Sequence, residues 1–347
     1  MTSLLERITT PLLPADYLDL IRPLRAGAPL RGRIVAVLPE TRDAVTVVIK
    51  PGRGWRGHRP GQFLRLGVEV DGVRHWRSYS LTSAPGRADG CVSITAKAIP
   101  NGVVSSHLAR HATVGTIVEL EQAAGDFTID DPAPAAMLFV TAGSGITPVM
   151  GMLRSLTATR TTDIVVVHSA PTAGDVIFGG ELRMLARRGR IRLIEAHTRT
   201  DGRLNPARLA EMVDDLGSRS TWACGPAEFL ESLEDHWAAT GITERLRTER
   251  FRPALIATGD GGTVTFSATA TTVEADGSTS LLETGEAAGV LMPSGCRMGI
   301  CFGCVVPLRH GTVRDLRNGA VTTAAEGDGV AIQTCISAAA GDCQIDL

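Results

Sequence analysis

The sequence lacks three features that would each point to a particular class of protein. The formal net charge is only −2 over 347 residues, so the overall charge gives no sign of a nucleic-acid partner. No run of about 18 uncharged apolar residues occurs, and we therefore expect no membrane span. The seven cysteines are an odd number in a long chain, which argues against a disulfide framework. These absences favour a cytoplasmic protein, and the length of 347 residues predicts two or three domains.

Charge and cysteine are unevenly distributed along the chain. From Ala254 onward there are four arginines and ten acidic residues, a net charge of −6, whereas the first 253 residues carry a net charge of +4. Five of the seven cysteines also follow residue 295. We expect a mildly basic body that attracts a dinucleotide, and an acidic C-terminal domain suited to a basic docking face on a partner.

The N-terminal part of the chain predicts an arm followed by a barrel. Residues 1–30 show no sustained periodicity and form the predicted arm, with a short helix near Ala15–Ile21. Over residues 31–132, short β-forming runs broken by glycine and proline predict an antiparallel β-barrel. The pair Asp71-Gly72 predicts a hairpin turn within it.

The rest of the chain predicts two further domains. Over residues 133–253, near-continuous apolar runs alternate with helical segments, which predicts a parallel α/β sheet. A glycine-rich linker over residues 254–262 leads to a small β-rich domain over residues 263–347. There the pattern alternates from Val264 onward, and we expect it to turn at Asp276-Gly277.

Four cysteines near the C-terminus have the spacing of iron–sulfur ligands. The pattern is C-x4-C-x2-C-x30-C, and its members are Cys296, Cys301, Cys304 and Cys335. This spacing is typical of a plant-type [2Fe–2S] cluster, with three ligands from one glycine-laced loop and the fourth from a distant strand. Zinc is the alternative for four cysteines, although structural zinc sites usually pair two C-x-x-C-like knuckles. A Rieske centre needs histidines, and His310 is the only one in this domain.

A glycine-rich loop and a Cys-Gly-Pro segment each follow a predicted strand. In the loop TAGSGITP, Gly143 and Gly145 would let the backbone approach a pyrophosphate at a helix N-terminus. The motif is not the full G-x-G-x-x-G, because Pro148 replaces the third glycine. Cys224 ends another predicted strand at the same edge of the sheet, and taken alone it is more simply a buried structural cysteine.

The segment RSYS lies on a predicted barrel strand. By alternation Arg77 and Tyr79 share one face of the strand and Ser80 lies on the other. Arginine suits a phosphate, and tyrosine suits stacking on a flat ring. Taken alone, the segment is more simply a half-exposed strand.

Five motifs in one order resemble the ferredoxin–NADP⁺ reductase superfamily. They are RSYS, Gly102-Val-Val-Ser105, GSGITP, CGP and Glu249-Arg250-Phe251. With the C-terminal cysteines, the chain is similar to NAD(P)H-dependent flavin/iron–sulfur oxidoreductases. The resemblance implies an antiparallel β-barrel for the flavin, a parallel α/β sheet for NAD(P) and a β-grasp ferredoxin-like domain. The arm PLLPADYLDLIRPL and the loop GCRMGICFGC further resemble actinobacterial reductases of membrane-bound acyl-CoA desaturases.

The resemblance implies roles in flavin binding for residues of the barrel. Arg77 would hold the flavin pyrophosphate, Tyr79 would stack against the isoalloxazine, and Ser80 would form a hydrogen bond near flavin N5. Gly102 and Ser105 would bind the FAD pyrophosphate where a short helix begins. This second phosphate motif favours FAD over FMN.

The resemblance also implies a pyridine-nucleotide site. Gly143, Gly145 and Thr147 would receive the dinucleotide, and Cys224 would lie beside the nicotinamide. Phe251 would cover the other flavin face until the nicotinamide displaces it.

The sequence does not decide between NADPH and NADH. Pro171 stands where many relatives carry an arginine for the adenosine end of the nucleotide. Arg199 and Arg203 are the alternative contacts for a 2′-phosphate.

By resemblance, electrons would pass from NAD(P)H through FAD and the [2Fe–2S] cluster to an external protein. We expect this acceptor to be a membrane di-iron acyl-CoA desaturase. The alternative acceptor is a ring-hydroxylating or alkane-oxidising oxygenase. A non-catalytic electron-carrier subunit, locked in a complex, is a third interpretation. The reductase would be cytoplasmic, or held at the inner face of the membrane through its partner.

Overall fold

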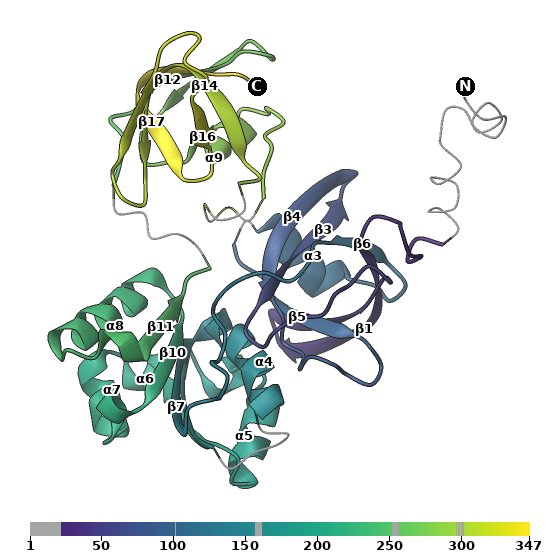
Figure 1. Ribbon diagram of the computed structural model, residues 1–347, viewed down its shortest axis with the longest axis vertical. Coiled ribbons are helices and arrows are strands. Elements are labelled where there is room, and N and C mark those ends of the chain that lie inside the picture. The colour runs from purple at the N-terminus through teal and green to yellow at the C-terminus, as the bar shows by residue number, and fades with distance from the viewer. Residues whose placement is uncertain are drawn as a thin grey trace. The chain divides into compact units, whose positions relative to one another are not determined.

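A computed structural model describes residues 22–100, 102–156, 162–251, 257–295, 297, 299 and 302–347 (Figure 1). It contains two compact units, Met1–Glu249 and Arg250–Leu347. The helix predicted near Ala15–Ile21 and the predicted cluster ligands Cys296 and Cys301 lie outside the described residues.

The first unit begins with an antiparallel barrel, as the sequence predicts. Its strands are β1 (Arg31–Thr41), β2 (Ala44–Pro51), β3 (Phe63–Val70), β4 (Val73–Ser80), β5 (Val92–Lys97) and β6 (Ile117–Leu120), with α3 (Val103–His111) between the last two. They pair in the order β4-β3-β6-β1-β2-β5, and a bridge between Leu81 and Ile94 joins the two edges. Asp71 and Gly72 both adopt left-handed φ values, 51° and 79°, which confirms the predicted hairpin turn between β3 and β4.

A parallel sheet with helices on both faces completes the first unit. Its strands are β7 (Ala136–Ala142), β8 (Asp163–Ala170), β9 (Arg192–His197), β10 (Ser220–Cys224) and β11 (Leu246–Glu249). The helices are α4 (Ile146–Leu156), α5 (Gly179–Arg187), α6 (Thr198–Asp201), α7 (Pro206–Met212) and α8 (Ala227–Ala239), with 3-10 turns η1 (Gly143–Gly145), η2 (Ala173–Asp175), η3 (Leu216–Ser218) and η4 (Thr243–Arg245).

The near-continuous apolar runs of this sheet supply two cores. Along β7, Met137 and Phe139 pack with α4 and α5 on one face, whereas Leu138 and Val140 pack with α7 and α8 on the other. The strand order is β11-β10-β7-β8-β9, so the direction of the chain across the sheet reverses between β7 and β10. Ligands of such sheets bind at this switch point, beyond the carboxyl ends of the strands.

The C-terminal unit is a mixed sheet with one helix. Its elements are β12 (Gly262–Phe266), β13 (Thr271–Ala275), α9 (Leu281–Ala287), β14 (Val305–Asp315), β15 (Val321–Ala324), β16 (Ala331–Gln333) and β17 (Ser337–Ile345). The order is β13-β12-β17-β14-β15, with β16 paired to β14, and only β12 and β17 run parallel among the described strands. This arrangement is the ferredoxin-like fold that the resemblance implied.

The strand predicted from Val264 onward is shorter than expected. A hairpin turn at residues 267–270, where Ala270 has a φ of 51°, interrupts it between β12 and β13. The chain also turns at Asp276-Gly277, where Gly277 has a φ of 76° and Asp276 accepts hydrogen bonds from the backbone N–H groups of Ser278 and Thr279 ahead of α9. The Ser-Ala-Thr-Ala sequence of the hairpin turn contains none of the Gly, Asn or Asp residues that usually mark one, which is why the pattern does not predict it.

Candidate functional site

The glycine loop and the Cys-Gly-Pro segment meet at the switch point of the parallel sheet. Thr141 of β7 lies beside Cys224 of β10 in the register. A Cβ atom on Gly145 would lie 2.0 Å from the carbonyl oxygen of Cys224, so no other residue fits there. Gly143 has a left-handed φ of 55°. The backbone of the loop is therefore open toward a ligand on one side and closed against β10 on the other.

Thr147 shapes this loop from within the first turn of α4. Its Oγ1 donates a hydrogen bond to the carbonyl oxygen of Ser144 at 2.9 Å, and the residue is almost fully buried. The structure thus gives Thr147 a local role in holding the loop. The helix N-terminus that follows the loop favours the negative charge of a pyrophosphate.

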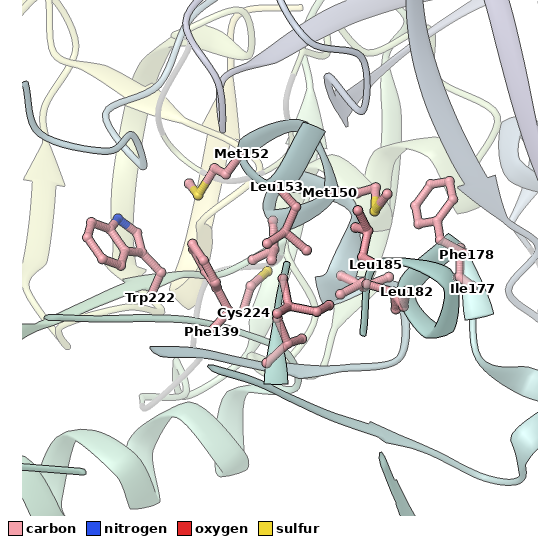
Figure 2. Packing of buried hydrophobic residues seen from close by; sticks show 14 of the residues in the cluster. Phe139, Met150, Met152, Leu153, Ile177, Phe178, Leu182, Leu185, Trp222 and Cys224 are labelled. Carbon is pink, nitrogen blue, oxygen red and sulfur yellow. The ribbon is translucent and has the colours of Figure 1, made fainter. Parts of the chain in front are cut away.

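Buried Cys224 and half-buried Glu249 form a pair of ionisable groups at the end of the sheet. They are register partners on β10 and β11, and Figure 2 shows Cys224 packed among apolar side chains such as Phe139. Burial, together with the charge of Glu249, raises the pKa of the Cys224 thiol well above its usual value, so the thiol stays neutral.

Glu249 is a functional candidate that the sequence motif contained but did not explain. Burial raises the pKa of its carboxyl to about 8. Its Oε2 atom is buried without a hydrogen-bond partner in the part of the chain that the structure describes. A carboxyl with these properties can hold a proton near neutral pH at the edge where a nicotinamide would lie.

The RSYS segment occupies the end of β4, beside β3. Tyr79 packs against the barrel core, and burial raises the pKa of its phenol further above the usual value, so it stays neutral. Arg77 is half-buried, and its Nη1 donates to the carbonyl oxygen of Trp76 at 2.8 Å. Ser80 is buried, with 6% of its surface exposed.

Ser78, which the sequence reasoning missed, supports a polar ligand along this strand. Its Oγ is buried and has no hydrogen-bond partner among the described residues. A buried hydroxyl without a partner costs free energy, which a polar group of a bound flavin would offset.

The N-terminus of α3 fits a second phosphate. Gly102 caps this nine-residue helix, and the first turn holds no acidic residue. A Cβ atom on Gly102 would lie 2.3 Å from Oγ of Ser105, and that hydroxyl donates to the Gly102 carbonyl oxygen at 3.3 Å. Only glycine fits at this cap, and the first N–H groups of a helix have no partner within the helix, so they can bind a phosphate. The described residues fit FAD.

Arg199 and Arg203 lie in different surroundings. The backbone N–H of Arg199 donates to the carbonyl oxygen of Pro171 at 3.2 Å, which places Arg199 at the carboxyl ends of β8 and β9. The guanidinium of Arg203 instead forms an exposed ion pair with Glu228 of α8 at 3.1 Å.

Cys304 and Cys335 meet in the C-terminal unit. Cys304 immediately precedes β14, and Cys335 lies in the turn between β16 and β17 rather than within a strand as expected. Both are buried, and a hydrogen bond with Cys335 lowers the pKa of the Cys304 thiol to about 6. All five cysteines in the described part of the chain are free thiols. Two adjacent buried thiols fit ligands of an iron–sulfur cluster.

Phe251 lies two residues after the end of the first unit. It belongs to the C-terminal unit and is 38% exposed, a high value for a phenylalanine. An exposed ring is what a displaceable cover for a flavin would need, but its role stays a prediction.

Comparisons with known proteins agree with this geometry. Three family models match in succession: an oxidoreductase FAD-binding domain over residues 54–129, an oxidoreductase NAD-binding domain over residues 139–235, and a 2Fe-2S iron-sulfur cluster binding domain over residues 264–340. These matches support the iron–sulfur interpretation of the four cysteines over zinc.

Individual relatives and one solved structure extend over most of the chain. An NADPH oxidoreductase of Mycobacterium tuberculosis is 50% identical over 98% of this chain and 90% of its own length. A glycine betaine monooxygenase reductase subunit of Chromohalobacter salexigens is 30% identical over 80% of this chain and 84% of its own. The structure of phthalate dioxygenase reductase has a TM-score of 0.63 at 22% identity, covering 91% of this chain and 97% of that one, which shows a shared fold. The chain thus belongs to the ferredoxin–NADP⁺ reductase superfamily, as an NAD(P)H oxidoreductase with an FAD-binding barrel, an NAD-binding sheet and a C-terminal [2Fe–2S] domain.

Proposed function

We propose that this chain is the reductase component of an oxygenase system, which takes electrons from NADPH and delivers them to a separate oxygenase. The observation that carries the proposal is the close approach of Gly145 to Cys224, which would form a nucleotide site in the same chain as the paired thiols Cys304 and Cys335. When bound, FAD takes two electrons and a proton from NADPH as a hydride, and the cluster passes electrons on one at a time.

The protein residues bind and orient these groups. The loop around Gly143 and Gly145 would hold the nucleotide pyrophosphate, and the end of β4 with the N-terminus of α3 would hold FAD. Neutral Cys224 and protonated Glu249 would line the nicotinamide without placing a negative charge beside it.

The acceptor is better supported as an oxygenase than as a desaturase. The C. salexigens relative is named a monooxygenase reductase subunit, and the solved neighbour is named a dioxygenase reductase. This favours the alternative interpretation, a ring-hydroxylating or alkane-oxidising oxygenase. The desaturase expectation rests only on the resemblance of the arm and of the cysteine loop.

The nucleotide is proposed to be NADPH, with Arg199 as the main contact of the 2′-phosphate. Within the described ranges Arg199 forms no ion pair, whereas Arg203 is already paired with Glu228. The 50% identical relative is named as an NADPH oxidoreductase, which supports the same choice.

The protein is proposed to be cytoplasmic, and any contact with a membrane would be made through its partner. Among the described residues, no helix has the length and apolar character needed to cross a bilayer.

Reconstitution tests the proposal. The purified full-length chain, loaded with FAD and cluster, is mixed with candidate ring-hydroxylating oxygenases, alkane-oxidising oxygenases and desaturases, and acceptor-dependent oxidation of NADPH and NADH is measured. We expect product formation with an oxygenase and a preference for NADPH. Coupling to a desaturase alone would reverse the choice of acceptor. No NAD(P)H oxidation by the isolated chain, even with cytochrome c, would instead favour the non-catalytic carrier.

A further inference from the structure

Helix α4 touches both halves of the proposed hydride-transfer site. It begins where the nucleotide loop ends, and its later turns contact the barrel segment that follows the flavin strand. A Cβ atom on Gly151 would lie 2.4 Å from the carbonyl oxygen of Leu81, the residue directly after Ser80. Ordinary carbon–oxygen contacts are longer by about 1 Å, so only glycine permits this approach.

Arg154, one turn further along α4, ties the same barrel segment to the next helix. Its Nη1 donates to the carbonyl oxygen of Thr82 at 2.6 Å. Its Nε and Nη2 donate to both carboxylate oxygens of Glu181 in α5, at 3.0 and 2.6 Å. Bidentate, charge-assisted pairs of this kind fix direction as well as distance. The position of α4 along the barrel is therefore held at two adjacent points.

Arg154 also packs against the ring of Phe178, the residue that directly precedes α5. The guanidinium lies 5.0 Å from the centre of the Phe178 ring, and Figure 2 shows this ring near Met150 of α4. Phe178 is buried with a left-handed φ of 59°, which is costly for a bulky residue and persists only where the surroundings enforce it.

Glu40 of β1 supplies part of that enforcement. Burial raises the pKa of its carboxyl, while a hydrogen bond from Oγ1 of Thr46 at 2.6 Å, the charge of Arg154 and the backbone N–H of Phe178 act to lower it. The Glu40 carboxylate thus accepts a hydrogen bond from the residue that precedes α5, and the Thr82 carbonyl accepts one from α4. The two parts of the first unit are joined by polar contacts that have a defined geometry.

We propose that Gly151 and Arg154 are positioning residues that set the distance between the nucleotide loop and the flavin strand. Both lie on α4, whose first residue directly follows the loop, and neither belongs to the residues proposed to bind the nucleotide or flavin. Hydride transfer depends steeply on the separation of donor and acceptor, and a misplacement of about 1 Å can cost on the order of 100-fold in rate. The inference rests on the proposed transfer from NADPH to FAD.

Gly151→Ala in the full-length, FAD-loaded protein is the first test. We expect unchanged flavin content and a Kd for NADPH within about twofold, while the rate of flavin reduction in stopped-flow experiments falls by roughly 10- to 100-fold. The long-wavelength absorbance that reports contact between nicotinamide and flavin should weaken in parallel. NADPH deuterated at the transferred position should show a more temperature-dependent isotope effect.

Gly180→Ala is the matched control, because it is also a helical glycine but a Cβ there meets no described atom within 4 Å. It should leave every one of these measurements unchanged. Arg154→Lys is a second variant that keeps the charge and loses the bidentate geometry, and it decides the matter if Gly151→Ala does not fold.

The outcomes separate this inference from the proposed function. If the wild-type protein is not reduced by NADPH, the proposed function fails. If the wild-type protein is reduced but both variants are reduced within about twofold of its rate, or slow only in proportion to lost flavin, the positioning role is wrong.

Discussion

The two ends of the proposed electron path are built in different ways. At the nucleotide end, the chain fixes the geometry by itself: the Gly145 backbone lies against the Cys224 carbonyl, between two buried cores. At the cluster end, the described residues contribute two neighbouring thiols, and metal–sulfur bonds would complete the geometry. Substitutions should therefore act by steric displacement at the first site and by loss of ligation at the second.

The largest effect that would sharpen this comparison is expected from Cys335→Ser. The variant should lose the visible absorbance and electron paramagnetic resonance signal of the cluster, together with NADPH-dependent reduction of cytochrome c. Reduction of the flavin by NADPH should remain, because the nucleotide site is in the other unit. Cys343→Ala removes a buried thiol of the same domain and should keep the cluster. Parallel loss of flavin reduction in Cys335→Ser would contradict the separation of the two ends.

Gly145→Ala should impair the nucleotide site and leave the cluster site unchanged. A methyl group 2.0 Å from the Cys224 carbonyl must displace the loop, and we expect kcat/KM for NADPH to fall by about 100-fold. Flavin and cluster contents should be retained, as measured by absorbance. In Gly217→Ala the new Cβ meets its nearest neighbour at 3.7 Å, so normal kinetics are expected there. Normal kinetics in Gly145→Ala would show that the loop is not fixed by packing.

Arg199→Ala should have a smaller and selective effect. Loss of a charge-assisted hydrogen bond to the 2′-phosphate should raise KM for NADPH by roughly 10-fold. KM for NADH should stay within about twofold, because NADH has no such phosphate. Arg203→Ala, which removes an exposed ion pair with Glu228, is the comparison and should change less. Equal increases for both nucleotides would show that Arg199 does not read the phosphate.

Glu249 should have the smallest effect on turnover, but it should make the stability of the fold depend clearly on pH. Its pKa is about 8 in the folded chain and near 4.5 when unfolded, so the folded state binds the extra proton between these values. The contribution of this carboxyl to the free energy of unfolding should therefore be lost as pH rises from about 5 to 8, by an amount on the order of a few kcal/mol.

Thermal unfolding of wild type and Glu249→Gln between pH 5 and 9 measures this dependence. The neutral amide should remove it, so that the difference in Tm grows toward high pH in favour of the variant. A constant difference across the range would mean that the carboxyl does not titrate there.

The sequence was sufficient for features that depend on local pattern. The apolar run of β7 predicted a strand buried on both faces, and Asp71-Gly72 predicted a hairpin with the correct turn. Motif order placed Gly145 and Cys224 at one edge of a sheet, where the structure brings them into contact.

Features that depend on packing between distant segments were not accessible in the same way. Gly151 and Arg154 look like ordinary helix residues until Leu81 and Thr82 are placed beside them. Helix α9 is too short for a periodic signal to stand out. The buried, unpartnered Oγ of Ser78 follows from burial alone, which no spacing reveals.

The end of β11 has a practical consequence for recombining such reductases. This edge strand pairs with β10 over its whole length, and its last residue, Glu249, faces Cys224 and also closes the first unit. A fusion junction placed before Leu246 would remove a strand from the nucleotide-binding sheet. A junction after Phe251 would keep the sheet whole and retain the predicted flavin cover, so a different electron-carrier module could be grafted there while the dehydrogenase half is left intact.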